Sequence, residues 1–403
     1  MGAVPVLSLG VGLVMKVLIA LNSAWNLLNF RSGLIRALLA DGHAVVLAAP
    51  ADEHVPALQA LGARFVHLPM RTHGTNPVAD LALLLRFVRV LRSERPDVLM
   101  GYTAKPNVYG SLAAHALHIP VLNNIAGLGS VFIRGGWLVK VLQQLYRLAL
   151  ARSRRVFFQN PDDLQLFLKL GMVANAQTAL LPGSGVDLQK FRPAPLPCWQ
   201  GPAATQSVGH RRFVFLLVAR MLKDKGVEEY VQAARLIKAI HPLGECALLG
   251  FIDSDNPNAI SAQQMQAWVD EGVVRYWGTS SDVRVQLAQA DCVVLPSYRE
   301  GSPRTLLEAA AMARPLVATD VPGCREVVRH GINGLLCAPR DAQSLAKQMA
   351  AILNMTDASL QNMGEASRQW VQTNFDEQIV IDRYRQALAD LDGVRSCITK
   401  GRK

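Results

Sequence analysis

The sequence predicts an α/β protein with two doubly wound, Rossmann-like domains and C-terminal helices that cross back to the first domain. Short apolar runs rich in β-branched residues alternate with helical patterns along most of the 403 residues, which is typical of parallel sheets covered on both faces. The alternation occurs twice, on either side of a segment between Phe191 and His210 that is rich in Pro, Gly, Ser and Gln. This segment has the composition of a linker. Half of the residues are hydrophobic, so each half of the chain has material for a core of its own.

We expect four segments: an apolar N-terminal extension over 1–14, a first domain over 15–195, a second over 196–375, and a crossover helix with a basic tail over 376–403. Residues 1–14 lack the basic start and the cleavage pattern of a signal peptide. They are also shorter than the roughly 20 residues that span a bilayer. We therefore expect no transmembrane helix, and the run that begins at Met15 has the pattern of a natural protein start.

The expected elements follow from the period of the apolar residues. Strands of the first half are predicted at Val17–Leu21, Ala44–Ala49, Ala63–Leu68, Val98–Tyr102, Pro120–Asn124, Val156–Gln159 and Thr178–Leu181. Its helices are predicted at Phe30–Asp41, Val55–Leu61, Ala79–Ser93, Asn107–Leu117, Gly136–Ser153 and Pro161–Leu170. Strands of the second half are predicted at Arg212–Val218, Cys246–Phe251, Val273–Trp277, Cys292–Leu295, Leu316–Thr319 and Gly334–Cys337. Its helices are predicted at Val227–Ile240, Ser261–Glu271, Asp282–Gln289, Thr305–Ala313, Cys324–Arg329, Asp341–Leu353, Asp357–Asn374 and Asp376–Leu391.

Charge and cysteine content narrow the class of protein. The six cysteines form no CxxC pair and no His/Cys cluster, which predicts reduced core thiols in a cytoplasmic protein and no structural metal. Of the net charge of +11, +9 falls in residues 1–190, and no acid lies between Val98 and Pro161. Such a surface suits nucleic acid, an anionic membrane or a phosphorylated substrate, or it is simply solvated. Trp137–Arg155 predicts a basic amphipathic helix, which either lies on a membrane surface or packs on the core.

Ligands of doubly wound sheets bind at the carboxyl ends of the strands, so two facing domains are expected to leave a cleft there. The central stretch, 297–308, follows the buried-looking run 291–296 and leads into an Ala/Leu helix. We expect Ser302 as the helix N-cap and Pro303 as the first helical residue. The N-terminus of such a helix can hold an anion. Glu300 is then expected exposed in the loop, and Glu308 fixed on the helix.

These two carboxylates could act as a general acid and base, or be solvated surface acids. Their different settings favour separate duties, with Glu308 accepting ribose hydroxyls and Glu300 holding hydroxyls of a transferred group. Arg220 and Lys225 follow the first strand of the second domain, and a rigid guanidinium beside a mobile ammonium suits a diphosphate. The alternative is a charged loop without a ligand.

Weaker signals lie in other loops. Asp253-Ser254-Asp255 could chelate a divalent cation, but a lone Asp-x-Asp is a weak pattern. The glycine-rich dinucleotide fingerprint is missing after the first strand, which argues against an NAD enzyme. Four residues of the first domain are instead expected to face the cleft or the acceptor: Asn22, Gly33 at the opening of a helix, Lys105 and Asn123. The loop 183–187 is expected near the hinge, as a structural or a ligand-contacting segment.

Together these motifs resemble the retaining glycosyltransferases of family 4, which have the two-domain GT-B fold. Glu300 and Glu308, with seven residues between them, match that family's paired glutamates, and Arg220 with Lys225-Gly226 matches its diphosphate clamp. The resemblance implies sugar transfer from a UDP-sugar with retained configuration and with no essential metal or other cofactor. It also implies that Arg220 and Lys225 neutralise the departing diphosphate, that Glu300 holds the donor sugar and that Glu308 holds the ribose. It also places further donor-binding residues at Gly301, Ser302, Pro303, Arg304 and Thr305.

Segments 103–107, 126–129, 159–163 and 181–187 resemble a subgroup that builds capsule, O-antigen or related glycan precursors. Its nearest named activity is N-acetylgalactosaminyl transfer onto an undecaprenyl-diphosphate-linked sugar. The resemblance thus implies a lipid-linked or saccharide acceptor, an anionic membrane surface as a partner, and a peripheral position on the cytoplasmic face of the inner membrane. Two departures stand out, because Ala126 occupies the place of a family histidine and Ser302-Pro303 that of Phe-Gly, with Arg304 added.

Two other functions remain open from the sequence. Nucleotide-sugar 2-epimerases share this fold and bind the same donors without a lipid acceptor, although the basic first domain favours transfer. A nucleic-acid-binding protein would also explain the +9 of the first half, and its affinity would fall steeply with salt. We expect no nucleic-acid partner.

Overall fold

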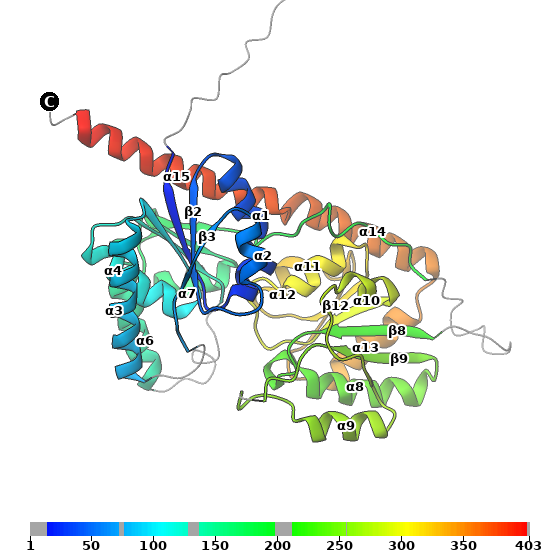
Figure 1. Cartoon of the computed structure of the whole chain (residues 1–403). Coiled ribbons are helices and arrows are strands. Elements are labelled where there is room, and N and C mark those ends of the chain that lie inside the picture. Colours follow the sequence, from blue (N-terminus) through cyan, green and yellow to red (C-terminus); the bar gives the residue numbers. More distant parts are fainter. Residues whose placement is uncertain (1–13, 72–75, 128–136, 198–211, 255, 401–403) are drawn as a thin grey trace, which may run out of the picture. The chain divides into compact units, whose positions relative to one another are not determined.

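A computed structural model describes residues 14–71, 76–127, 137–197, 212–254 and 256–400 (Figure 1). The chain forms two compact units. Unit 1 comprises Met1–Phe158, Leu164–Leu180 and Val380–Lys403, and unit 2 comprises Gln159–Asp163 and Leu181–Ile379. Nearly all of the expected N-terminal extension and most of the expected linker lie outside the described residues.

Unit 1 contains a parallel seven-stranded sheet in the order β3-β2-β1-β4-β5-β6-β7. This arrangement is the doubly wound order, in which the chain reverses direction across the sheet between β1 and β4. The strands lie close to the expected runs: β1 (Lys16–Ala20), β2 (Ala44–Ala49), β3 (Arg64–His67), β4 (Val98–Tyr102), β5 (Val121–Ile125), β6 (Arg155–Phe158) and β7 (Thr178–Leu180).

Helices cover both faces of this sheet (Figure 1). They are α1 (Ala24–Ala40), α2 (Val55–Ala60), α3 (Pro77–Glu94), the π-helix η1 (Pro106–Gly110), α4 (Ser111–Ala116), α6 (Trp137–Leu150), α7 (Pro161–Lys169), the 3₁₀ turn η2 (Asn175–Gln177) and α15 (Glu377–Lys400). One face packs against α3 and α4, and its continuation over β5 and β6 packs against α6 and α7. Helix α1 begins at Ala24, six residues before the expected start, because the Ser23 hydroxyl caps it by accepting from the Asn26 amide.

Unit 2 contains a parallel six-stranded sheet in the equivalent order β10-β9-β8-β11-β12-β13. Its strands are β8 (Phe213–Val218), β9 (Gly244–Leu249), β10 (Arg275–Tyr276), β11 (Cys292–Leu295), β12 (Leu316–Thr319) and β13 (Gly334–Cys337). Its helices are the 3₁₀ turn η4 (Lys223–Lys225), α8 (Val227–Ile240), α9 (Ala262–Asp270), α10 (Arg284–Gln289), α11 (Arg304–Ala311), α12 (Cys324–Val327), α13 (Ala342–Leu353) and α14 (Asp357–Asn374). The two doubly wound sheets confirm the predicted fold class.

Two apolar cores hold unit 2 together, one on each face of its sheet. The first joins the sheet to α8, α9 and α13, and the second joins it to α10, α11, α12 and α14. The strands β8, β9, β11 and β12 are buried on both faces, as their continuous apolar runs require. Among the described residues, no helix combines the length and the hydropathy that crossing a membrane needs.

The chain passes between the units at two main places, after Leu180 and after Ile379. Residues 181–195, expected in the first domain, belong to unit 2. The two passing segments lie next to each other, because the Val186 amide donates to the Phe375 carbonyl (2.8 Å) and the Glu377 amide donates to the Val186 carbonyl (3.1 Å).

Candidate active site

The candidate site of unit 2 lies where the strand order reverses, between β8 and β11. The chain adds strands to one side of such a point and then to the other, and ligands of doubly wound sheets bind beyond the carboxyl ends of the strands there. Arg220 follows β8, and Glu300 follows β11. The sheet topology therefore brings together two motifs that lie 80 residues apart in the sequence.

Lys225 and Glu300 form an ion pair at this point, with Nζ and Oε1 2.5 Å apart and side chains only 20% and 14% exposed. Gly226 makes the approach possible. It has a φ of +72°, and a Cβ there would lie 2.0 Å from the Pro296 carbonyl oxygen. A side chain at position 226 would push the Lys225 turn away from the end of β11, so glycine is required by contact and by conformation.

The exposed position expected for Glu300 is wrong, since the structure largely buries its carboxylate. Backbone contacts hold the loop on the body of unit 2: the Glu300 amide donates to the Pro322 carbonyl (3.1 Å), and the Asn160 side-chain amide donates to the Gly301 carbonyl (3.1 Å). Paired with Lys225, the carboxylate is not a solvated surface acid.

Sequence reasoning missed the support that segment 159–163 gives to this loop. Asp163 is fully buried and forms an ion pair with Arg299, directly before Glu300. Asn160 is buried too, and its side-chain oxygen accepts from the Asp163 amide (2.8 Å). The available signal was Asn160-Pro161-Asp162-Asp163 after an apolar strand, where a buried acid would need a cation. Nothing in the pattern named the partner.

Glu308 lies on α11 beside Arg304, whose Nε donates to its Oε1 (2.8 Å). Burial raises the pKa of the Glu308 carboxyl, and the Arg304 guanidinium opposes this rise. More distant charges add to the balance, with Lys190 lowering the pKa of Glu308 and Asp282 raising it. The Glu308 carboxylate therefore needs the nearby Arg304 guanidinium to stay ionised in this buried setting.

The predicted start of α11 is wrong by one residue. Pro303 is the N-cap, in extended conformation and without a side-chain cap bond, and the helix begins at Arg304. The Ser302 side chain does not cap the helix, and its hydroxyl is buried against the backbone of Gly183. Thr305 donates its hydroxyl proton to the Val218 carbonyl at the end of β8 (2.9 Å), so this side chain fastens the helix start to the neighbouring strand.

Arg220 is half-exposed at the same crevice, and its guanidinium lies 3.8 Å from the Asp253 carboxylate. Asp253 thus has a cation partner of its own, and Asp255 lies outside the described residues. Over the ranges that the structure describes, no group of three or more His, Cys, Asp or Glu residues could hold a metal ion.

Lys105 and Asn123, two of the four candidate residues of unit 1, are engaged with other protein groups. Lys105 is paired with Asp80 (2.9 Å). Asn123 is fully buried and donates to Asn107 (2.9 Å) and Ser111 (2.9 Å), so it holds η1 and α4 on the sheet.

Asn22 is the candidate at the carboxyl end of β1, an inner strand of the sheet. It lies directly beyond β1, where its side-chain oxygen accepts from Asn26 (3.0 Å). Gly33 lies inside α1 and does not open it.

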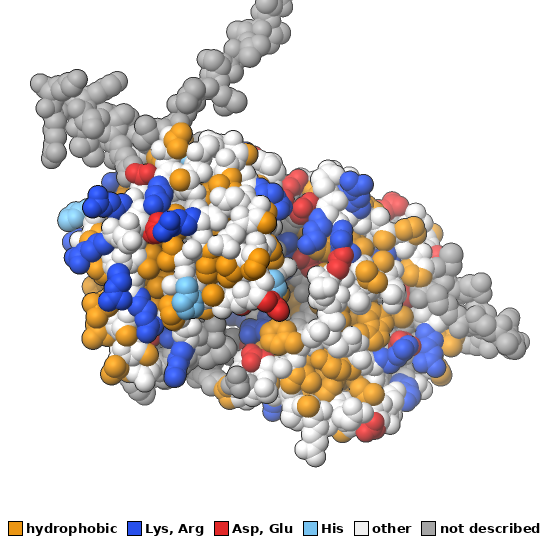
Figure 2. Space-filling view, viewed as in Figure 1, with side chains coloured by type: hydrophobic (Ala, Val, Ile, Leu, Met, Phe, Trp, Pro, Cys, Tyr) orange, Lys and Arg blue, Asp and Glu red, His pale blue; other side chains and the backbone are white. Residues whose placement is uncertain are grey.

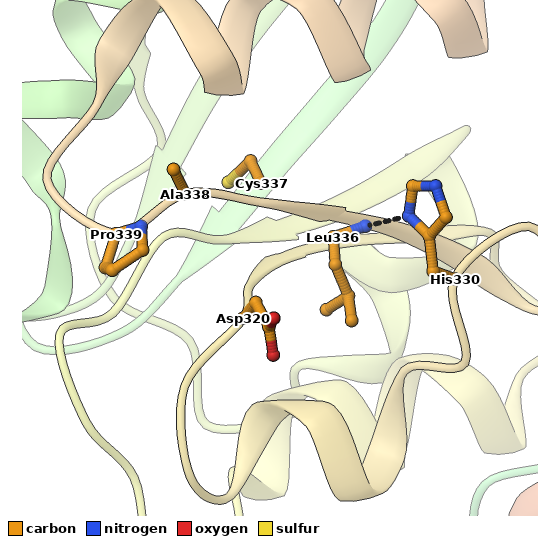
Figure 3. Close-up of a pocket in the computed structure, with 6 residues that line it drawn as sticks. All are labelled: Asp320, His330, Leu336, Cys337, Ala338 and Pro339. Atoms are coloured by element: carbon orange, nitrogen blue, oxygen red, sulfur yellow. Dashed lines mark hydrogen bonds between the residues drawn. The ribbon is translucent and has the colours of Figure 1, made fainter.

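Unit 2 also has a cavity of about 450 Å³ beyond the ends of β12 and β13, lined by Asp320, His330, Leu336, Cys337, Ala338 and Pro339 (Figure 3). Its polar groups are engaged with protein. Nδ1 of His330 accepts from the Leu336 amide (2.9 Å), and Asp320 is paired with Arg325 (2.8 Å). None of the predicted site residues lines it, and we do not place the chemistry there.

Two models of glycosyltransferase domains match the chain. Residues 30–183 match the family model "Glycosyl transferase 4-like domain", and residues 212–355 match "Glycosyl transferases group 1". Together the two matches cover well over half of the chain. The chain is 28% identical, over 88% of its length and 93% of the relative's, to the N,N'-diacetylbacillosaminyl-diphospho-undecaprenol alpha-1,3-N-acetylgalactosaminyltransferase of Campylobacter jejuni.

A second relative is the UDP-Gal:alpha-D-GlcNAc-diphosphoundecaprenol alpha-1,3-galactosyltransferase of Escherichia coli, 22% identical over 81% of this chain and 84% of that protein. Among solved structures, HepE of Anabaena in complex with UDP and glucose has a TM-score of 0.72, 19% identity, and coverage of 93% of this chain and 99% of that one. Sucrose-phosphate synthase of Thermosynechococcus elongatus has a TM-score of 0.76, 21% identity, and coverage of 94% and 100%.

The two doubly wound, Rossmann-like units are the architecture of the GT-B fold, which the similar solved structures share. The chain belongs to the family of group 1, family 4-like glycosyltransferases that the two matching models describe. It is therefore a transferase enzyme.

Proposed function

We propose that the protein is a retaining glycosyltransferase that moves an N-acetylhexosamine or related hexose from a UDP-sugar to a polyprenyl-diphosphate-linked sugar, or another surface-polysaccharide precursor, at the inner membrane. The observation that carries the proposal is the shielded Lys225–Glu300 pair at the switch point of unit 2. Its chemical setting suits a diphosphate donor, and the relatives from Campylobacter jejuni and Escherichia coli are named for diphospho-undecaprenol-linked acceptors.

The charges favour a division of labour around the donor. Arg220 and Lys225 would neutralise the negative charge that develops on the departing UDP, which is the main electrostatic task of the transition state. Glu300 would accept hydrogen bonds from the sugar hydroxyls, and Glu308 from the ribose. Because the leaving phosphate oxygen can take the proton of the attacking acceptor hydroxyl on the same face, this mechanism needs no side-chain base. We propose no resident metal or other cofactor, since the two cations supply the positive charge.

A membrane surface as partner is supported by the outer face of α3. Three apolar side chains follow each other along this helix at helical spacing, Val78 (78% exposed), Leu81 (58%) and Leu85 (58%). The same line continues to Arg89 and Arg92, which are both exposed. Apolar side chains in line with arginines match the interface of an anionic bilayer.

The acids of α3 do not oppose this docking. Asp80 is paired with Lys105, and Glu94 is paired with Lys16 and Arg64, so both carboxylates are shielded. Helix α6 continues the surface with exposed Val141 and Leu148 beside basic residues. In Figure 2, the area over α3, α4 and α6 at the left is coloured mainly for basic and hydrophobic side chains. Each basic residue near an anionic leaflet contributes about 1 kcal/mol, which predicts reversible docking.

Vesicle sedimentation tests this part of the proposal. The wild type is expected to bind vesicles rich in phosphatidylglycerol and to leave neutral phosphatidylcholine vesicles unbound. The double variant Leu81→Asp/Leu85→Asp places two anions among the exposed apolar side chains of α3 and should lose most of this binding. The control is Leu236→Asp/Ile240→Asp, which puts the same two charges, at the same spacing, on exposed apolar residues of α8 in unit 2. If Leu81→Asp/Leu85→Asp binds vesicles as well as the wild type does, α3 does not contact the membrane.

Transfer itself is tested by incubating the protein with a panel of UDP-sugars and a polyprenyl-diphosphate-linked sugar, then identifying the product by mass and by anomeric configuration. We expect one lipid-linked product with the donor's configuration retained. A free epimer formed from a UDP-sugar alone would instead establish the 2-epimerase alternative. Salt-sensitive binding to nucleic acid at about 50 mM salt, where the phosphate contribution is strong, would revive the third candidate.

A further inference from the structure

Arg304 connects two parts of unit 2 that are far apart in the sequence. Its Nε donates to Oε1 of Glu308 (2.8 Å). Its Nη1 donates to the Ser184 hydroxyl (3.0 Å) and to the Gly185 carbonyl (3.2 Å). One guanidinium thus joins the carboxylate on α11 to the segment 181–187. Only a rigid, planar group with several donors makes such contacts at once.

Segment 181–187 is where the chain has just passed from unit 1 into unit 2. It is fixed against the place of return, because Val186 bonds to both Phe375 and Glu377. Gly185 has a φ of +69°, and a Cβ there would lie 2.4 Å from the Glu377 Cα. The two chain passages are therefore in close backbone contact at the residue whose carbonyl accepts from Arg304.

We propose that Arg304 is a positioning residue, which fixes the Glu308 carboxylate for the nucleotide and ties it to the paired chain passages at Ser184–Gly185. The proposal rests on the proposed function, in which Glu308 accepts the ribose hydroxyls. It assigns Arg304 no contact with the donor. The departure of the helix start from the family pattern, with Ser302-Pro303 followed by Arg304, thus has its effect through Glu308.

The setting of Glu308 requires such a partner. Its carboxylate is mostly enclosed, and a buried anion without a cation takes up a proton or turns toward water. The bond from Arg304 to Oε1 fixes the orientation in which the carboxylate is presented to a diol. Since the other side of the guanidinium is held by the backbone at Gly185, rotation of the Arg304 side chain is restricted as well.

The test measures UDP affinity by calorimetry for the full chain and for Arg304→Met, Arg304→Lys and Glu308→Gln. We expect Arg304→Met to weaken UDP binding by roughly tenfold to a hundredfold, the range for a lost bond to a charged group. Arg304→Lys keeps the charge and should recover part of the loss. In the double variant Arg304→Met/Glu308→Gln, the affinity should be about that of Glu308→Gln alone, because both changes remove the same interaction.

The pH profile separates positioning from a purely structural role. Without Arg304, the pKa of Glu308 should rise further, so UDP affinity should be lost at a higher pH than in the wild type. The groups that set this profile are Arg304 and Lys190, which lower the pKa of Glu308, and Asp282, which raises it. Comparing each variant with the wild type at the same pH cancels the titration of UDP itself.

Arg235→Met is the matched control, since Arg235 forms an ion pair with Glu271 on the exposed side of α8. It should leave UDP affinity unchanged. Additive losses in the Arg304/Glu308 double variant, or an unshifted pH profile for Arg304→Met, would overturn the positioning role. If the wild type binds no UDP at all, the proposed function fails instead, and the two failures are distinguishable. Thermal unfolding of each variant identifies any that do not fold.

Discussion

At Glu308 the function and the stability of unit 2 have opposite requirements. In the proposed function, nucleotide binding needs the ionised carboxylate of Glu308, while burial favours the protonated form and so raises its pKa. Arg304 reduces this conflict without removing it. Functional carboxylates in enclosed sites commonly carry a shifted pKa for this reason.

The raised pKa of Glu308 predicts a stability change with a definite sign. Above the ordinary carboxyl pKa of 4.5, the unfolded chain has largely lost this proton, while the folded protein still holds it. The contribution of Glu308 to the free energy of unfolding should therefore fall as the pH rises through that interval. Urea unfolding of the wild type and Glu308→Gln over a pH series measures it. The difference in free energy, wild type minus variant, should decrease with pH, and parallel curves would contradict the assignment.

Arg220 tests the diphosphate clamp. Its guanidinium is half-exposed and 3.8 Å from Asp253, so the ion pair contributes at most about 1 kcal/mol to stability. Arg220→Ala should thus fold normally and still weaken UDP binding by about tenfold or more, the effect of a lost charge-assisted bond to phosphate. Calorimetric titration with UDP checks this, with Arg235→Ala as the control. Unchanged UDP affinity would remove Arg220 from the clamp.

At the scale of elements, the apolar runs predicted most strands to within two residues because both faces of each sheet are buried. The strand β11 (Cys292–Leu295) matches its prediction in full. Side-chain partners were harder to predict. Arg299 pairs with Asp163, 136 residues earlier in the chain, and no local pattern reports such a contact. The burial of Glu300 depends on this distant support, so its exposure was predicted wrongly.

The helix start at Ser302-Pro303 shows a second limit of sequence patterns. Ser followed by Pro is typical of an N-cap and a first helical residue, yet Pro303 occupies the cap itself. Packing explains the shift, because the Ser302 side chain fills the space above Gly183. Tertiary contact here decides against the local preference.

A further prediction concerns Gly226, in the turn before α8. Gly226 has a positive φ, and an added Cβ would meet the Pro296 backbone. Gly226→Ala should therefore destabilise unit 2 by about 1–3 kcal/mol and displace Lys225 from Glu300. A lower melting temperature together with weaker UDP binding is the expected result. Gly278→Ala is a suitable control, because its φ is also positive but no atom lies within 4 Å of the added Cβ. Equal effects of the two changes would show that contact with Pro296 is unimportant.

At the scale of the whole molecule, the chain returns to unit 1 to complete it. Tyr384 of α15 is fully buried and accepts a bond from Asn124 of β5 (3.1 Å). Val380, Leu388 and Leu391 of the same helix are buried as well. The prediction of helices that cross back to the first domain is thus confirmed by contacts within unit 1.

Truncation after Ile379 should therefore unfold unit 1. Burying each large apolar side chain contributes about 1.5–3 kcal/mol, and the four lost residues together approach the whole stability of a domain. We expect the full chain to unfold thermally in two steps, one for each unit. The truncated chain should show only the step of unit 2, and its unit 1 should be cleaved by protease. Arg385→Ala, which removes an exposed ion pair with Asp41, should change little. A protease-resistant unit 1 in the truncated chain would contradict the inferred role of α15.

In the proposed function the Lys225–Glu300 pair is the centre of sugar transfer, and the variant Glu300→Gln removes the charge of its carboxylate. The amide keeps the shape of the side chain and removes its charge, so the variant should fold and keep UDP affinity within a few-fold. The measurement is the single-turnover rate of sugar transfer from the active UDP-sugar to the polyprenyl-diphosphate-linked acceptor. We predict a loss of at least about a hundredfold, the scale for removing one electrostatic contact of a transition state. Transfer at the wild-type rate would show that the Glu300 carboxylate takes no part in sugar transfer.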